Sequence, residues 1–426
     1  MTFLSQVARD RVHHGSMHLL STLGVRVDHE EVLDRLEERG AAVDRMNHIA
    51  RLPEHTIMEA LSCAPSTAVI EDQNGHRYLL RPEGESVYWT GNALYMVEGA
   101  HRREISTRDF SRMAALVDRL EHVHAMVGTS IADVPPRCRD FVGFRLMAEQ
   151  TTKHLRPVIF SAEGANAILE MARVLLDGKD HAQHPIFSLG YSNVSPLHWT
   201  ATALELMRFT SGYRIPIMLN AEPMAGGTSP VTIAGSILAG NAEILSGIVI
   251  AQLLEQGRPC IYNLGFAHVL DMRTTVALTG SPETSLFAVS GAEMAAYYHL
   301  PCASWASTDS VVMDSQAAYE KMLAFLTHTQ AGVNVIWGVG QLEAQLSLSL
   351  AQAVIDNEIL GYVNRYRRGF GTEEEDFALK VIQEAGFQGD FLSHDHTLQH
   401  YRDELSVSDL ANRDRRGRWS APGTAG

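Results

Sequence analysis

Aromatic residues recur along the central part of the chain, and their chemistry is the first pointer to a binding site. Rings together with carboxylates can solvate a cation that has no N–H group to donate, such as a quaternary ammonium. Any single ring serves equally well as core packing, so the set is more informative than one member. The rings predicted to bind substrate are Trp89, Tyr95, Tyr191, Phe266, Trp305 and Trp337.

Acidic residues recur over the same region. We predict Glu222, Asp309 and Glu343 as catalytic residues, and Glu163 and the amide of Asn220 as substrate-binding residues. A carboxylate near a helix N-terminus can instead simply favour the helix dipole, which suits Glu163. A cage for a cation needs only one or two free acids, because more would overstabilise the bound ground state.

Several other chemistries are disfavoured. A Schiff-base mechanism lacks its nucleophile, because none of the lysines is predicted at a strand end; they are Lys153, Lys179, Lys321 and Lys380. The first predicted strand, VYWTG, has no His-x-His pair, which argues against a binuclear metal hydrolase. The tail carries three histidines without a companion ligand pattern, so no metal site is predicted there: His394, His396 and His400.

The elements that would position these residues follow a regular alternation. From residue 86 onward, short β-rich runs are each followed by a helical pattern, eight times over roughly 280 residues, which predicts an α/β fold of the (β/α)₈ barrel type. A doubly wound open sheet is the alternative, but it has fewer repeats and a phosphate loop. The predicted strands are Ser86–Thr90, Val123–Gly128, Pro157–Ser161, Pro185–Gly190, Ile215–Asn220, Pro259–Gly265, Pro301–Ser304 and Asn334–Gly338.

Barrel enzymes build their sites at the carboxyl ends of the strands, and the residues named above lie at or just past those ends. The predicted organisation is a small α+β region over residues 1–85, the barrel over 86–370, and a helical C-terminal extension over 371–426. These boundaries place the whole candidate site in the barrel.

Composition narrows the partners. The chain has 426 residues, 45% of them apolar, and a formal net charge of −15. Such a charge argues against nucleic acid and an anionic membrane surface. No signal peptide is recognisable at the N-terminus, and the four cysteines show no paired spacing, so a reduced, cytoplasmic compartment is expected.

The stretch LNAEPMAGGTSPVTIAG, residues 219–235, combines a strand end, a glycine-bearing loop and a helix start. It contains neither GxGxxG nor a following GK[ST], so no phosphate site is predicted. Ser229 is expected as the N-cap and Pro230 as the first helical residue. The helix then runs towards Glu255 and is apolar on most faces, so we expect it to be buried, against a second subunit of a homo-oligomer.

Several ordered segments resemble the trimethylamine:corrinoid methyltransferase (MttB) family, in its non-pyrrolysine branch. They include LLSTLGVRVDHEEVLDRLEERGAAVD, MLNAEPMAGGTSPVTIAGSILAGNAEILSGIVIAQLL, YEKMLAFLTHTQAGVNVIWGVGQLE, AVIDNEILGYVNRYRRG and SHDHTLQHYRDEL, which together span most of the chain. The family has a barrel fold. The resemblance implies methyl transfer from a methylated amine to the cobalt of a corrinoid (cobalamin) carried by a partner protein, with no tightly bound cofactor.

Two departures from the family refine this expectation. Pyrrolysine is absent, and members lacking it are associated with quaternary amines such as glycine betaine. Family members also run further beyond the pair that matches Asp414 and Arg415, so an altered partner surface is expected. In this reading Gly226 and Gly227 keep the mouth of the pocket open.

Other readings stay open at this point. His268 and Arg273, after the sixth predicted strand, are candidates to hold a betaine carboxylate, and an ordinary surface loop fits them equally. The methyl acceptor could be tetrahydrofolate bound directly. The chain could also be a betaine-binding protein without catalysis.

Overall fold

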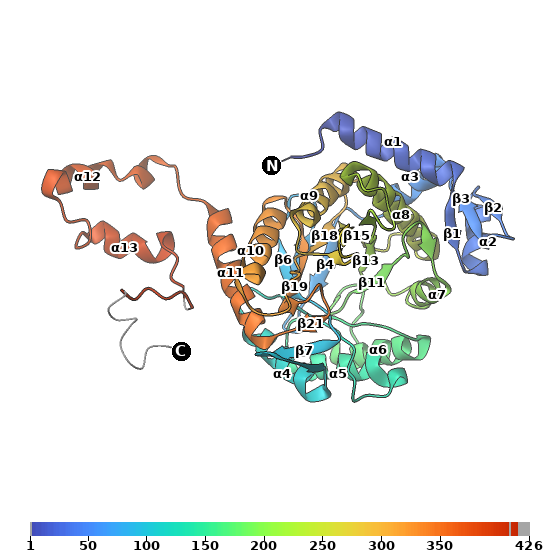
Figure 1. The fold of residues 1–426 in the computed structure, drawn as a ribbon, viewed down its shortest axis with the longest axis horizontal. Coiled ribbons are helices and arrows are strands. Elements are labelled where there is room, and N and C mark those ends of the chain that lie inside the picture. Colours follow the sequence, from blue (N-terminus) through green and yellow to red (C-terminus); the bar gives the residue numbers. More distant parts are fainter. Residues whose placement is uncertain (1, 409, 416–426) are drawn as a thin grey trace. The chain divides into compact units, whose positions relative to one another are not determined.

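A computed structural model describes residues 2–408 and 410–415. In this part of the chain, eight parallel strands form a nearly closed barrel, ringed by helices (Figure 1). The predicted α/β barrel is therefore confirmed. In spatial order the strands are β10 (His154–Arg156), β9 (Ala125–Val127), β6 (Val87–Thr90), β19 (Val335–Val339), β18 (Cys302–Trp305), β15 (Cys260–Gly265), β13 (Ile217–Asn220) and β11 (Leu189–Ser192).

The barrel has a seam between β10 and β11. A single parallel bridge, Leu155 to Phe187, joins the two strands there, with backbone hydrogen bonds from Leu155 to Ile186 (3.0 Å) and from Ser188 to Leu155 (3.1 Å). Above this bridge, β10 pairs with β9 and β11 pairs with β13. The carboxyl ends of β10 and β11 are therefore free to diverge.

Alternate residues of the strands fill the barrel interior. The core cluster takes Val87 and Trp89 from β6 and Val335 and Trp337 from β19, in keeping with the two-residue period of a strand. The opposite faces pack under helices, so these strands are buried on both sides. The helices that follow them are α4 (Thr107–Arg119), α5 (Arg139–Gln150), α6 (Ala162–Leu175), α7 (Ala201–Phe209), α8 (Ile233–Leu254), α9 (Pro282–Tyr297), α10 (Ser315–Gln330) and α11 (Leu350–Arg368).

The amino end of the barrel is closed by a hairpin of β4 (Ala68–Glu71) and β5 (Arg77–Leu80). Its apolar side chains join the core cluster of the barrel interior. The hairpin is tied to the strand starts, because the backbone N–H of Glu71 donates to Pro185 (2.9 Å) and its carbonyl contacts His154 Nδ1 (2.9 Å). A ligand must therefore enter from the carboxyl end.

The N-terminal residues build a second sheet on the outside of the barrel. Its order is β12 (His198–Trp199), β1 (Val25–Val27), β3 (Ile49–Arg51) and β2 (Ala42–Asp44), so it includes a strand from the loop after β11. The helices of this region are α1 (Gln6–Thr22), α2 (Glu30–Glu38) and α3 (Glu54–Cys63). The chain divides into two compact units, residues 1–357 and 358–426.

Helix α8 begins at Ile233, with Thr232 as the N-cap. The expectation of Ser229 as the cap and Pro230 as the first helical residue was wrong, because Ser229 bonds Ser236 Oγ at 2.6 Å, while its N–H donates to Met224 (3.1 Å). The apolar faces of α8 are covered by α1, α3 and α9 of the same chain (Figure 1), so its composition needs no second subunit.

By length and composition α8 could cross a membrane, but 78% of its most apolar window is buried inside the fold. A helix that is hydrophobic all round and buried in this way is a core helix.

Small strands surround the carboxyl end of the barrel. After β6 come β7 (Tyr95–Glu98) and β8 (His101–Glu104), which form one sheet with β20 (Gln341–Leu342) and β21 (Ser347–Leu348). On the other side, β14 (Met224–Ala225) forms a sheet with β16 (His268–Leu270) and β17 (Ala277–Leu278). These extra sheets form walls around the site.

The C-terminal unit is helical, with η2 (Glu374–Phe377), α12 (Leu379–Ala385), η3 (Gly386–Gln388) and α13 (Asp395–Glu404). The guanidinium of Arg365 donates to the Glu404 carbonyl at 2.5 and 3.1 Å. His394 caps α13 by accepting from the N–H of His396 (3.1 Å), and His396 packs on His400. Among the described residues, no group of three or more His, Cys, Asp or Glu is placed to hold a metal ion.

Candidate active site

Four of the predicted aromatic residues form one cluster at the carboxyl end of the barrel. The Trp337 ring lies 5.5 Å from Trp89 and 5.4 Å from Phe266, centroid to centroid, and Phe266 lies 5.6 Å from Trp305. Trp305 Nε1 donates to Gln341 Oε1 (2.5 Å). Trp89 is fully buried and lies deepest, whereas Phe266 is only partly buried and lies just past its strand.

The two tyrosines lie outside this cluster, although Tyr191 lines a cavity together with Trp337. Tyr191 points away from the barrel interior, since its hydroxyl contacts Thr210 Oγ1 (2.6 Å) and donates to the Leu206 carbonyl on α7 (3.2 Å). Tyr95 lies on β7, where the Arg102 guanidinium stacks over its ring at 3.8 Å. Neither ring contacts the aromatic cluster in the structure.

A chain of polar side chains crosses three neighbouring strand ends. Asn263 donates to Asn220 Oδ1 (2.8 Å), Asn220 donates to Ser192 Oγ (3.2 Å), and Ser192 donates to Glu222 Oε1 (3.1 Å). Ser192, Asn220 and Asn263 stand in register on β11, β13 and β15, which explains why they meet. Burial raises the pKa of the Glu222 carboxyl, opposed by the Ser192 hydrogen bond and by nearby His268.

Asp309 and Glu343 fix loops around the mouth. Asp309 Oδ1 accepts from the N–H of Thr279 (2.7 Å) and from its hydroxyl (3.1 Å), which ties the loop after β18 to the residue that follows β17. Glu343 pairs with Arg102 and accepts from Ser347 Oγ (2.6 Å). Glu343 also has φ +54°, in a run of left-handed residues that turns β20 back towards β21.

The remaining predicted residues lie outside the aromatic cluster. Glu163 is exposed in the first turn of α6. The side chain of Arg273 is 91% exposed and lies 3.6 Å from Asp271. His268 is half-buried on β16, with Nδ1 bonded to the Phe266 carbonyl (3.0 Å).

The loop of Gly226 and Gly227 forms a tight turn and offers no cradle for a phosphate. Gly226 has φ +88° and donates its N–H to Ser229, while the N–H groups of Gly227 and Thr228 both donate to Met224. Because these backbone N–H groups are already paired, an anion would have to displace the carbonyl oxygens that accept from them.

A cavity of about 200 Å³ opens at the seam of the barrel, where the ends of β10 and β11 diverge. Its wall includes Trp337 from the aromatic cluster, Ser192 and Asn220 from the polar chain, and Arg156 at the end of β10. Arg156 was missed because the third strand was predicted to begin at Pro157. That prediction was wrong: the strand is His154–Arg156.

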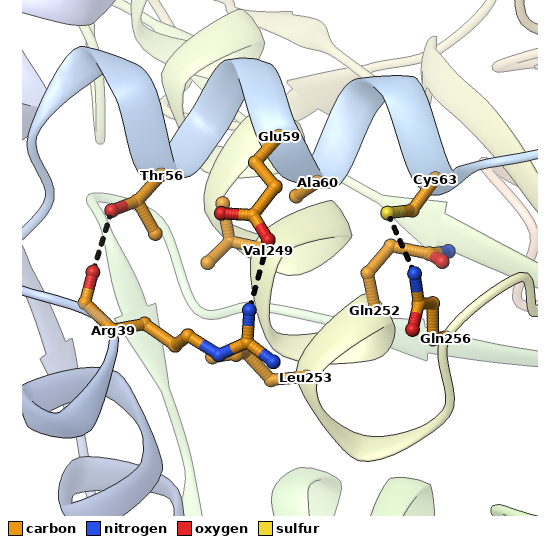
Figure 2. A pocket seen from close by; sticks show the side chains of 9 residues that line it. All are labelled: Arg39, Thr56, Glu59, Ala60, Cys63, Val249, Gln252, Leu253 and Gln256. Atoms are coloured by element: carbon orange, nitrogen blue, oxygen red, sulfur yellow. Dashed lines mark hydrogen bonds and ion pairs between the residues drawn. The ribbon is translucent and has the colours of Figure 1, made fainter.

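A second cavity of about 200 Å³ lies between α3 and α8 (Figure 2). The part of its lining that α8 supplies comes from the C-terminal half of that helix, which leads into the start of β15 and so lies at the amino end of the barrel. Arg39 pairs with Glu59 (2.9 Å), and Thr56 donates to the Arg39 carbonyl (2.9 Å). The carboxylate of Glu59 is thus already paired with Arg39, and none of the predicted site residues lines this cavity.

The sequence profile of the family described as trimethylamine methyltransferase (MTTB) matches residues 1–426. The chain belongs to this family. Among curated members it is 28% identical to the trimethylamine methyltransferase MttB of Desulfitobacterium hafniense strain DCB-2, over 97% of this chain and 84% of that one. It is 29% identical to the MttB of Methanosarcina barkeri strain Fusaro, with coverages of 97% and 85%.

Another relative carries a different substrate in its name. The chain is 26% identical to the glycine betaine methyltransferase of Desulfitobacterium hafniense strain Y51, over 96% of this chain and 86% of that one. Among solved structures, the monomethylamine methyltransferase MtmB of Methanosarcina barkeri superposes with a TM-score of 0.56 at 12% identity, covering 85% of this chain and 83% of that one. At this identity the likeness supports the barrel fold alone.

One carboxylate near the site of this MTTB family member was not predicted from the sequence. Glu243 on α8 is fully buried; it accepts from Ser195 Oγ (2.8 Å) and from the N–H of Leu197 (2.9 Å), and burial raises its pKa. The sequence does carry a signal for it, because an acid within the apolar run NAEILSGIVI is expected to be buried and therefore to need a hydrogen-bond or ion-pair partner. Glu243 thereby holds the loop that follows β11.

Proposed function

We propose that the protein transfers a methyl group from a quaternary amine of the glycine betaine type to the cobalt of a corrinoid held by a separate protein. One observation carries the proposal most directly: rings of Trp337, Trp305 and Phe266 cluster at the carboxyl end of the barrel, opposite the end that the β4–β5 hairpin closes. Aromatic faces bind a cation that cannot donate hydrogen bonds. Family membership and the names of the relatives support the reaction type.

The reaction requires little acid–base catalysis from the protein. The N–CH₃ bond breaks with its electron pair remaining on nitrogen, and the methyl group passes to cobalt(I), which acts as the nucleophile. A quaternary ammonium leaves as a neutral tertiary amine, so no general acid is needed. The corrinoid is the second substrate, and the chain must align one N–CH₃ bond with it, a positioning effect that supplies several kcal/mol.

The described residues can divide this work. Trp337 and Phe266 would face the ammonium, while Glu222, held by Ser192, would orient it. The burial that raises the pKa of Glu222 disfavours its charged form, which would limit ground-state stabilisation of the cation. Asp309 and Glu343 would act by fixing the loops of the mouth, because each is already bonded to other side chains.

A cytoplasmic location fits this proposal. All four cysteines carry free thiols in the structure, and cobalt(I) chemistry requires a reducing environment.

Formation of methylcobalamin tests the function. Protein, free cob(I)alamin and glycine betaine should give methylated cobalamin, followed by its absorption spectrum, and the rate should fall to background without protein. Methyl transfer to tetrahydrofolate in the absence of any corrinoid would show that the acceptor is a folate and not a corrinoid. Tight betaine binding without methyl transfer to any acceptor, including a corrinoid protein, would show a betaine-binding protein and would refute the proposed methyltransferase activity.

A further inference from the structure

Arg156 is a buried cation at the open end of the barrel. It is the last residue of β10 and only 7% exposed. The strand alternates, so Arg156 faces inward like His154, whose ring lies 5.6 Å from that of Trp89. Burial lowers the pKa of the guanidinium to about 10, which still leaves it protonated at neutral pH.

The protein gives this cation few partners. Arg156 Nη1 donates to the carbonyl of its neighbour Pro157 (2.6 Å), and Nε is buried with no acceptor. No described carboxylate forms an ion pair with it. A buried charge without a counter-ion is costly, so such groups are normally paired.

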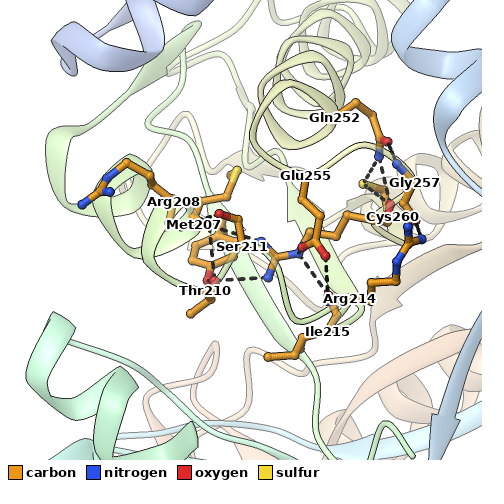
Figure 3. A network of polar contacts seen from close by, with 12 residues as sticks. Met207, Arg208, Thr210, Ser211, Arg214, Ile215, Gln252, Glu255, Gly257 and Cys260 are labelled. Carbon is orange, nitrogen blue, oxygen red and sulfur yellow. Dashed lines mark hydrogen bonds and ion pairs between the residues drawn. The ribbon is translucent and has the colours of Figure 1, made fainter. Parts of the chain in front are cut away.

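Two other buried cations in the described part of the chain show what satisfied ones look like. Arg258 donates to the carbonyls of Ile215 (3.1 Å) and Met207 (3.2 Å) and to Thr210 Oγ1 (3.1 Å), with Glu255 at 3.5 Å. Figure 3 labels these four partners of Arg258. Lys321 pairs with Asp356 at 3.1 Å. Arg156 differs from both, because no described carboxylate lies close enough to pair with its charge.

The surroundings leave space for an external anion. The guanidinium lines the cavity at the seam, beside Trp337, with its carbon 5.3 Å from that ring centroid. Nη2 lies against Gly190 of β11, where any Cβ would overlap it. Glycine at this position therefore allows the fork of Arg156 to reach the cavity.

We propose that Arg156 binds the carboxylate of the substrate, so that the protein selects betaines, quaternary amines that carry a carboxylate, over simple amines. The Arg156 guanidinium carbon and the Phe266 ring lie 5.3 Å and 5.4 Å from the Trp337 ring centroid, so a short zwitterion can place its carboxylate on Arg156 and its ammonium against the rings. A guanidinium suits a carboxylate because it can bind both oxygens. The inference rests on the proposed function and specifies its substrate class.

Calorimetric titration with three probes tests the assignment: glycine betaine, choline, which replaces the carboxylate by an alcohol, and tetramethylammonium. The parent protein should prefer glycine betaine. Arg156→Gln should weaken betaine roughly 10- to 100-fold, the range for a lost hydrogen bond to a charged group. Tetramethylammonium should bind within about twofold of the parent, because it does not use the carboxylate site.

Three further variants separate binding from folding. Arg156→Lys keeps the charge but not the fork, so it should lie between the parent and Arg156→Gln. Gly190→Ala should displace the guanidinium and also weaken betaine selectively. Arg145→Gln, an exposed arginine paired with Glu149 on α5, removes the same charge as a control and should change nothing.

The outcomes are distinguishable. If Arg156→Gln weakens all three probes equally, Arg156 supports the fold of the site and does not bind the carboxylate. If the parent binds tetramethylammonium and choline as tightly as betaine, the selectivity is absent, although the methyltransferase proposal stands. If the parent binds no quaternary amine and transfers no methyl group, both proposals fail.

Discussion

The guanidinium of Arg156 and the ring of Trp337 lie side by side, with 5.3 Å between the guanidinium carbon and the ring centroid. The pair comes from strands on either side of β9 and β6, so the curvature of the barrel brings it together. A cation and a ring in contact at a cavity wall offer one surface for an anion and one for a cation. That combination matches a zwitterion better than a simple amine.

Replacing Trp337 by alanine should weaken quaternary ammonium binding. A desolvated ring contributes on the order of 1–2 kcal/mol to a bound cation, so the Kd for tetramethylammonium should rise roughly 5- to 30-fold. Calorimetric titration measures the change. Trp199→Phe is a matched control, because Trp199 is buried on β12, where its Nε1 bonds Ser246. Unchanged binding by Trp337→Ala would place the cation site elsewhere.

Glu222→Gln should remove a pH dependence of binding. Only the ionised carboxylate attracts a cation, so the parent should bind tetramethylammonium more tightly as the pH rises through the pKa of Glu222, which lies above the ordinary value of 4.5. The variant should bind about fivefold more weakly at high pH and show no such rise, because the probe itself has no proton to lose. If turnover falls while binding holds, Glu222 orients the methyl group. A pH-dependent rise that survives in the variant would assign the titration to another group.

Asp356→Ala should destabilise the fold strongly. Asp356 pairs with the buried Lys321 (3.1 Å) and accepts from the N–H of Gly340 (2.7 Å), so its loss leaves a buried charge unpaired, at a cost of about 3–5 kcal/mol. Burial lowers the pKa of Lys321, an effect that Asp356 opposes. In the variant, the folded state therefore binds fewer protons than the unfolded state near the lysine pKa, and stability should rise with pH.

Urea unfolding of Asp356→Ala at several pH values measures this. The double variant Lys321→Met/Asp356→Leu should recover part of the loss, because it removes both charges at once. A loss below about 1 kcal/mol would mean that the pair is not buried in solution.

The barrel could be predicted from the sequence because strands that are buried on both faces appear as apolar runs between helical patterns. The sequence pattern located the strand ends less accurately: it predicts a strand start at Pro157, which cannot donate to a ladder and in fact follows the end of β10. That shift of three residues hid Arg156. In the same way, Tyr191 and Ser192 both lie at a strand end, but adjacent residues face opposite sides.

Long-range pairings had no local signal. Arg102 meets Glu343 from a position 241 residues away, and Asp309 meets Thr279 across a loop. The register that aligns Ser192, Asn220 and Asn263 could not be read before the strand boundaries were known. Residue type therefore indicated candidate acids, whereas their bonding partners separated the loop-fixing acids from those at the pocket.

Glu243→Gln should stabilise the protein increasingly as the pH rises. Burial raises the pKa of Glu243 above its ordinary value of 4.5, so the folded state holds a proton that the unfolded state releases. With more protons bound in the folded state, the free energy of unfolding of the parent falls as the pH climbs from 4.5 through the raised pKa. Glutamine lacks this titration and can still accept one of the two hydrogen bonds from Ser195 and Leu197. Urea unfolding from pH 4.5 to pH 8 should therefore show a difference in the free energy of unfolding between variant and parent, a gap that widens and then levels off.

Glu149→Gln, at an exposed position of α5, removes the same charge and should show no such gap. A gap that stays constant over this range would mean that Glu243 titrates alike in the folded and unfolded states, and that its burial is balanced by the hydrogen bonds it accepts.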